Sequence, residues 1–204
     1  MALPRGTRVC VVDDDPGFRR TLEGFLSAAG LEVESFRSPG DFLAAAPASA
    51  SAACLVLDLE LPGMTGLELQ EALAATAPDL PIVFISGTAD VRSGVQAMRS
   101  GAVDFLEKPF DGSQLLAAID RAVAKGGRER AERAAREEAR ALLARLTPRE
   151  RQVCDLVAQG LLNKQIAALV GTSEHTVKVH RAHALEKLKA DSVPDLVRIL
   201  DRAR

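Results

Sequence analysis

A short stretch in the first half of the chain, Cys54–Gly63, limits the possible folds more than any other segment. Its first residues are apolar, the carboxylate of Asp58 follows them, and Pro62-Gly63 then interrupts regular structure. An apolar run of this length between breakers is typical of a strand buried on both faces. Because open α/β sheets bind ligands at the carboxyl ends of their strands, Asp58 is predicted to be a cation ligand, a nucleophile or a cap for the next loop.

Four other apolar runs alternate with segments of helical spacing in the first half. The predicted strands are 8–12, 31–36, 52–57, 80–85 and 102–106. The predicted helices are one from Pro16 to Gly30, then 38–46, 67–77, 90–100 and 111–124. Strands that alternate with helices indicate a parallel sheet with right-handed crossovers, and about 120 residues suit a flavodoxin-like doubly wound domain.

Polar side chains stand at the ends of four of the predicted strands. Asp13 and Asp14 follow the first strand, Asp58 the third, Ser86 the fourth and Lys108 the fifth. Crowded carboxylates repel one another unless a cation joins them, and Mg²⁺ prefers such oxygen ligands. An ionised Asp58 would attack phosphorus to form an acyl phosphate, with Ser86 and Lys108 bonded to the phosphoryl oxygens.

The motifs VVDDD, LVLDLELPGMTGLEL, VFISG and GAVDFLEKPF together resemble the receiver domain of two-component response regulators. The resemblance implies that a histidine kinase phosphorylates Asp58. The implied Mg²⁺ ligands are Asp13, Asp14, Asp58 and the backbone carbonyl of Glu60. The implied phosphoryl-binding and switch residues are Ser86, Phe105 and Lys108. Asp15, which precedes a proline, is predicted to cap the first helix and not to bind the ion.

Charge is distributed unevenly along the chain. Residues 1–123 hold nine basic and 17 acidic residues, a net charge of −8, whereas residues 124–204 have a net charge of +6. This asymmetry indicates two domains, of which the basic one is the candidate for binding nucleic acid. Residues 125–145, rich in Ala, Arg and Glu, are predicted to be a solvated helical linker, with a dimerising coiled coil as the alternative. Gly126-Gly127 is predicted to break or loosen the preceding helix.

Four short helices are predicted in the basic half. Thr147 and Glu150, three residues apart, form a capping-box pattern at the start of the first one. Asn163, Ser173 and Ser192 are predicted to cap the other three. The two middle helices with their glycine-containing turn fit a helix-turn-helix in a small all-α domain.

The string from Leu146 to Leu200 resembles the LuxR-type DNA-binding domain of the NarL/FixJ family, and VKVHRA and PDLVR favour the FixJ-like branch. By this resemblance the third helix enters the major groove of double-stranded DNA, where Lys178 or Arg181 would read guanine and Val179 or Ala182 would touch a thymine methyl group. The implied DNA-binding residues are Asn163, Lys164, Thr176, Lys178, Val179, Arg181 and Ala182. The implied dimerisation residues are Val193, Leu196, Val197 and Leu200.

The predicted organisation is a receiver domain over 1–124, a linker over 125–145 and a DNA-binding domain over 146–204. The predicted protein is a cytoplasmic transcription regulator, not an enzyme, that dimerises on activation, with RNA polymerase as a further partner and no membrane contact. One alternative is an aspartyl-phosphate hydrolase, although such enzymes place a second Asp where this chain has Glu60. The other is a regulator whose receiver only dimerises, without phosphorylation.

Two absences and the cysteines support a cytoplasmic location. No apolar stretch approaches the roughly 18 residues that span a membrane, and the N-terminus leaves no room for a signal peptide before the first strand. Cys10, Cys54 and Cys154 are widely spaced and odd in number. They are predicted to be small buried hydrophobes in a reducing compartment.

Overall fold

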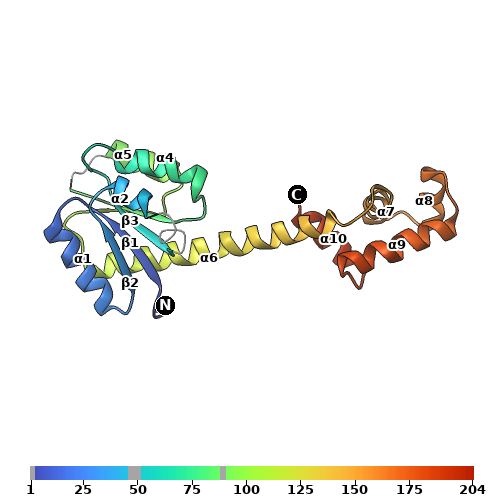
Figure 1. The fold of residues 1–204 in the computed structure, drawn as a ribbon, viewed down its shortest axis with the longest axis horizontal. Helices are drawn as coiled ribbons and strands as arrows, with labels where there is room; N and C mark the ends of the chain where they lie inside the picture. The colour runs from blue at the N-terminus through green and yellow to red at the C-terminus, as the bar shows by residue number, and fades with distance from the viewer. Residues whose placement is uncertain (1–2, 46–51, 88–90) are drawn as a thin grey trace. The chain divides into compact units, whose positions relative to one another are not determined.

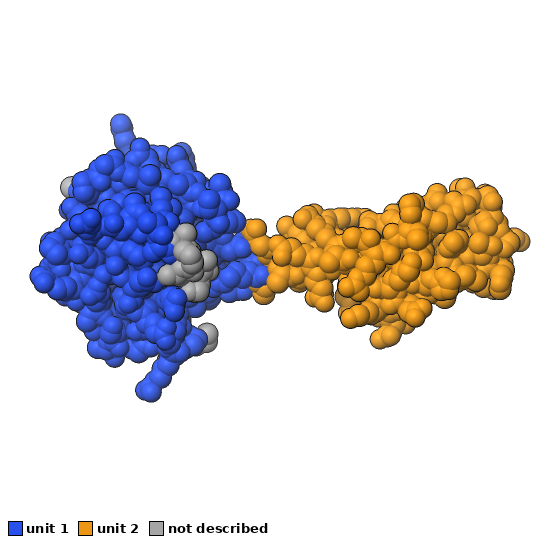
Figure 2. All heavy atoms as spheres, viewed as in Figure 1, with its two compact units in different colours: residues 1–130 blue, residues 131–204 orange. Residues whose placement is uncertain are grey.

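The computed structural model describes residues 3–45, 52–87 and 91–204. The chain divides into two compact units, Met1–Arg130 and Ala131–Arg204, which are called the N-terminal and C-terminal units below (Figure 2). The predicted helices over 38–46 and 90–100 each extend beyond the described residues at one end.

A five-stranded parallel sheet forms the centre of the N-terminal unit as far as the structure describes it (Figure 1). Its strands are β1 Arg8–Val12, β2 Glu32–Phe36, β3 Cys54–Asp58, β4 Ile82–Ser86 and β5 Asp104–Glu107. The order is β2-β1-β3-β4-β5, and every neighbouring pair is parallel. The predicted flavodoxin-like fold is confirmed, with β1 and β3 side by side at the sheet centre.

Helices cover both faces of this sheet because alternate residues of each buried strand point to opposite sides. Val9 and Val11 pack on the face covered by α1 Pro16–Ala28 and the first turns of α6 Gly112–Leu143. Cys10 and Val12 pack on the other face, which is covered by α2 Pro39–Ala44, α4 Gly66–Thr76 and α5 Val91–Arg99. All three cysteines are buried with free thiols, as predicted.

One continuous helix, α6, replaces the predicted fifth helix and most of the predicted linker. The predicted break at Gly126-Gly127 is wrong, because α6 runs through both glycines. A Cβ atom on Gly126 would lie 2.4 Å from Pro81 Cγ, so glycine at this position allows the helix to pack closely on the segment before β4. Within the described ranges, no helix is both long and apolar enough to cross a membrane.

Four further helices make up most of the C-terminal unit. They are α7 Pro148–Ala158, α8 Asn163–Val170, α9 Glu174–Leu188 and α10 Val193–Arg202. The capping box of Thr147 and Glu150 and the caps at Ser173 and Ser192 are confirmed. The cap at Asn163 is wrong: Asn163 is the first residue of α8, Leu162 holds the cap position, and the Gln165 side chain accepts a hydrogen bond from the Leu162 N–H.

Candidate functional site

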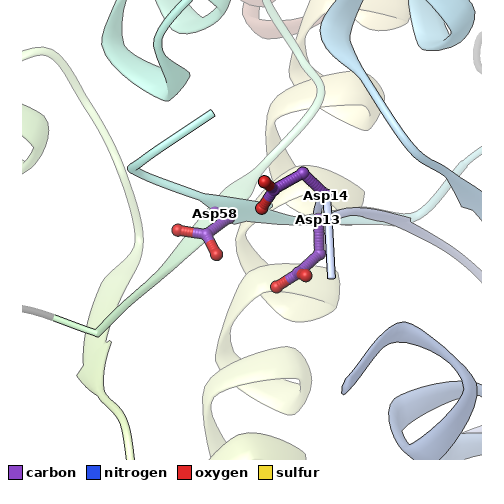
Figure 3. Close-up of side chains that lie close together, drawn as sticks. All are labelled: Asp13, Asp14 and Asp58. Atoms are coloured by element: carbon purple, nitrogen blue, oxygen red, sulfur yellow. The ribbon is translucent and has the colours of Figure 1, made fainter. Parts of the chain in front are cut away.

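Three carboxylates gather at the carboxyl ends of the two central strands (Figure 3). Asp13 and Asp14 follow β1, and Asp58 is the last residue of β3. One oxygen from each lies within 4.8 Å of the others. Asp13 is fully buried and Asp58 is 5% exposed, whereas Asp14 faces solvent. The sequence predicts that these strand-end residues lie close together, and the structure confirms it.

Lys108, from the loop after β5, joins two of these carboxylates. Its Nζ lies 2.8 Å from Asp13 Oδ2 and 2.6 Å from Asp58 Oδ2. The backbone N–H of Lys108 donates to the carbonyl of Ser86, 2.7 Å away, and the Lys108–Pro109 peptide bond is cis. The ammonium also lies 4.1 Å from the ring centroid of Phe18, in cation–π geometry. The side chain is therefore held from several sides.

Burial and neighbouring polar groups shift the pKa values of Asp58 and Lys108 in opposite directions. Desolvation by burial raises the pKa of Asp58, although the hydrogen bonds from Lys108 and from the Glu60 N–H lower it in part. Burial disfavours the charged form of Lys108 too, but its bonds to Asp13 and Asp58 outweigh this and raise its pKa. Three carboxyl groups within 4.8 Å of one another share one ammonium, and a divalent cation would relieve their mutual repulsion. The oxygen donors therefore fit Mg²⁺.

Backbone contacts fix the two buried carboxylates. Asp58 Oδ1 accepts from the Glu60 N–H at 3.0 Å, and Asp13 Oδ1 accepts from the Asp15 N–H at 2.9 Å. Asp58 thus also caps the loop after β3, in addition to its contact with Lys108. Asp15 itself caps α1, since its Oδ1 accepts from the Gly17 N–H at 2.7 Å, as predicted.

Three residues of the site were not predicted from the sequence. Phe18 lies under the Lys108 ammonium, and the Arg19 guanidinium donates to the Asp13 carbonyl at 2.7 Å. Gly66 opens α4 so close to β3 that a Cβ atom there would lie 2.4 Å from the Asp58 carbonyl oxygen. Phe18 carries no local sequence signal for its contact, because its partner Lys108 belongs to a distant part of the chain, whereas Arg19 lies only six residues from its partner Asp13.

An exposed apolar surface lies on α5, the helix between β4 and β5. It is formed by Val91, Val95 and Met98, which are 76%, 46% and 45% exposed, and is called the α5 face below. These residues and Phe105 line a surface pocket of about 550 Å³. Phe105 is half-buried on β5, and Ser86 is fully buried at the end of the neighbouring β4. Phe105 therefore borders the α5 face, and Ser86 ends the strand next to β3, which carries Asp58; their role as a switch pair remains a prediction.

The predicted DNA-binding residues lie on α8 and α9 of the C-terminal unit. Lys164, Lys178, Val179 and Ala182 are exposed, and Asn163, Thr176 and Arg181 are half-buried. Arg181 Nη1 lies 3.5 Å from Asn163 Oδ1, which brings the start of α8 to the middle of α9. Lys178 forms an ion pair with Glu174 at 3.4 Å.

The four predicted dimerisation residues on α10 divide into two kinds. Leu196 and Leu200 are 1% and 5% exposed and belong to the core of the C-terminal unit, so they are not available to a partner in this arrangement. Val193 and Val197 are half-buried. The apolar periodicity of α10 thus reflects mainly its packing within the unit, and a dimer surface there remains a prediction that depends on the two valines.

Comparison with known proteins finds similarity along nearly the whole chain. Residues 9–120 match the response regulator receiver domain, and residues 144–200 match the luxR family of bacterial regulatory proteins. Nodulation protein W of Bradyrhizobium diazoefficiens is 42% identical over 94% of this chain and 84% of its own length. The transcriptional regulatory protein FixJ of Azorhizobium caulinodans is 39% identical over 97% and 93%. The solved structure of the response regulator StyR has a TM-score of 0.83 at 41% identity, covering 96% of this chain and 98% of StyR.

Proposed function

The chain belongs to the NarL/FixJ-type response regulators, which pair a receiver domain with a LuxR-type DNA-binding domain, and we propose that Mg²⁺-dependent phosphorylation of Asp58 controls its dimerisation and DNA binding. One observation carries the proposal: the Lys108 ammonium contacts both Asp13 and Asp58 beside Asp14. Since the relatives are transcriptional regulators, the chain is a regulator and the hydrolase alternative is excluded. A sensor histidine kinase is the proposed phosphoryl donor.

The proposed transfer uses groups that already lie in contact. An Asp58 carboxylate oxygen forms a bond to phosphorus while the bond from phosphorus to the kinase histidine nitrogen breaks, and the electron pair of that bond stays on the imidazole. Lys108 then moves its hydrogen bond from Asp58 Oδ2 to a phosphoryl oxygen. Asp13, Asp14, Asp58 and the Glu60 carbonyl would hold Mg²⁺, whose charge offsets that of the phosphoryl oxygens.

The α5 face is the proposed output surface of the receiver. The Ser86 hydroxyl would move towards Asp58 and donate to a phosphoryl oxygen there. Phe105 would then fill the space that the Ser86 side chain leaves. Exposed apolar residues at the spacing of the α5 face are typical of a surface that a partner covers. We therefore expect phosphorylation to favour a dimer through α5 and β5, with Val193 and Val197 of α10 as a second contact.

DNA binding is proposed for α9, with α8 beside it. Lys178 and Arg181 are placed to read guanine, and Val179 and Ala182 to contact a thymine methyl group. Asn163, Lys164 and Thr176 are proposed to hold phosphates, which positions the helix without specifying sequence. RNA polymerase remains a predicted partner, and the cytoplasm is the proposed location because the promoter DNA lies there.

A footprint on the DNA upstream of the protein's own gene tests phosphorylation control. We expect beryllofluoride, a mimic of the phosphoryl group, to increase protection by the wild-type protein several-fold and to have no effect on Asp58→Asn, which lacks the ionised carboxylate. Identical footprints for both proteins, with and without beryllofluoride, would support the alternative of a phosphorylation-independent regulator.

Arg181→Ala tests the proposed base contact on α9. Loss of a bidentate contact to guanine is expected to weaken binding to the footprinted site about 10- to 100-fold, measured by fluorescence anisotropy at fixed salt. Arg151→Ala is the matched control, because Arg151 is an exposed residue of α7, outside the proposed DNA and dimer surfaces, and pairs with Asp155 there. Equal affinities of the two variants would contradict the assignment of α9 as the recognition helix.

A further inference from the structure

A buried glutamine connects two helices on the α5 side of the sheet. Gln70, on α4, is 5% exposed, and its Nε2 donates to the carbonyls of Ala97 and Ser100 at 3.2 and 3.1 Å. Both acceptors lie at the C-terminal end of α5, 27 and 30 residues away in sequence. Because carbonyls accept only from N–H or O–H donors, these two contacts fix which end of the amide faces α5.

The other atom of this amide has no such contact. Among the residues that the structure describes, Gln70 Oε1 is the buried side-chain polar atom without a hydrogen-bond partner. Burial of an unpaired acceptor opposes folding, and a leucine at this position would fill the space without that cost. In some proteins a buried polar residue that costs stability selects one arrangement among several.

Packing holds α5 only weakly. Within α5, Ala97 is the buried residue, and the larger side chains of the α5 face are exposed. A cavity of about 240 Å³ lies beside Gln70, lined by Leu73 and Ala77 of the α4 end and by Ser100. Burial of a single methyl group contributes less than two buried hydrogen bonds, so the amide of Gln70 is a major attachment of this end of α5 to α4. Lys125 of α6 adds a further bond just beyond this end, to the carbonyl of Gly101 at 3.1 Å.

We propose that Gln70 is a positioning residue that fixes the C-terminal end of α5 against α4 and thereby sets the placement of the α5 face. Loss of this attachment frees α5 to sample other placements and changes how readily two α5 faces meet. The second consequence rests on the proposed function, in which the α5 face forms the dimer, whereas the first depends only on the geometry around Gln70.

Gln70→Leu in the full-length protein tests this. The loss of two hydrogen bonds destabilises this variant, and the loss of the buried unpaired oxygen stabilises it. Because these two effects nearly cancel, we expect its unfolding midpoint to stay within about 3 °C of the wild type. Amide hydrogen exchange at residues 97–102 should accelerate about tenfold, with no change in α1. The dimer dissociation constant without beryllofluoride, measured by analytical ultracentrifugation, should change about three- to tenfold, because the placement of the α5 face is no longer fixed. Glu71→Leu, which introduces the same side chain at an exposed α4 position, should alter none of these.

The two readouts separate this inference from the proposed function. Unchanged exchange at 97–102, or an equal acceleration across the whole receiver, would overturn the positioning role. A selective acceleration in Gln70→Leu with an unchanged dimer constant, in a protein whose wild type does dimerise with beryllofluoride, would also overturn it. A third outcome is that the wild type never dimerises but Gln70→Leu still shows the selective acceleration. This would refute phosphorylation-controlled dimerisation and leave Gln70 as an attachment of α5.

Discussion

Asp58→Asn is expected to lower the labelling of the protein by radioactive acetyl phosphate about 100-fold or more in the presence of Mg²⁺. The amide that replaces the carboxylate carries no charge and is a far weaker nucleophile. The substitution also removes one of the three carboxylates that lie within 4.8 Å of one another. Chelation of the metal with EDTA should reduce labelling of the wild type as well, since the phosphoryl charge would then be poorly balanced.

Asp15→Asn is the matched control for this experiment. It makes the same change of charge in the loop after β1, but Asp15 caps α1 through the Gly17 N–H, and asparagine caps helices equally well. We expect it to retain most of the labelling. Labelling of Asp58→Asn at the wild-type level would show that another residue accepts the phosphoryl group, and loss in both variants would point to a general effect of local charge.

The second large effect is a loss of stability expected on substitution of Glu150, which is buried in the C-terminal unit. Glu150 is 4% exposed, and its carboxylate oxygens lie 2.8 and 2.7 Å from Lys187 Nζ. The same carboxylate accepts from the Thr147 N–H at 2.8 Å. This one side chain therefore joins the start of α7 to the end of α9 and completes the cap of α7.

Glu150→Gln is expected to lower the free energy of unfolding of the C-terminal unit by about 2 kcal/mol, and Glu150→Ala by about 3 kcal/mol. Glutamine still accepts from Thr147 but loses the charge opposite Lys187, and alanine loses both contacts. A loss of 2 kcal/mol in a unit of this size corresponds to roughly 10 °C in midpoint. Calorimetry is the suitable measurement, because the chain has no Trp or Tyr.

The dependence of this effect on pH follows from the pKa of Glu150. The hydrogen bond from Lys187, together with that from Thr147, lowers the pKa of Glu150 to about 2 from its ordinary value of 4.5. The stabilisation is therefore fully present above pH 4.5 and is lost as the pH falls towards 2. The difference between wild type and Glu150→Gln should be constant near neutral pH and shrink below pH 4.5.

Glu174→Gln is the control for this pair, because the ion pair of Glu174 with Lys178 on α9 is exposed. It is expected to cost less than about 0.5 kcal/mol and to show strong salt dependence. Equal losses for Glu150→Gln and Glu174→Gln would contradict a special role for the buried carboxylate.

Some features of this protein depend only on residues close together in the sequence, and these could be predicted. The apolar runs of the strands, the Asp15 cap and the capping box of Thr147 and Glu150 depend on contacts within about four residues. The meeting of Asp13 with Asp58 could also be predicted, since the carboxyl ends of parallel strands meet at one edge of a sheet.

Other features were decided by the tertiary structure. Lys108 contacts Asp13 across 95 residues, and Phe18 lies beneath its ammonium. Gly126, which by itself favours a helix break, stays helical because α6 packs against Pro81. The apolar periodicity of α10 fits both a core-facing side and a dimer surface, and in the structure Leu196 and Leu200 are buried in the core of the C-terminal unit. Periodicity shows which side of an element is apolar, but only the packing of distant segments determines what covers it.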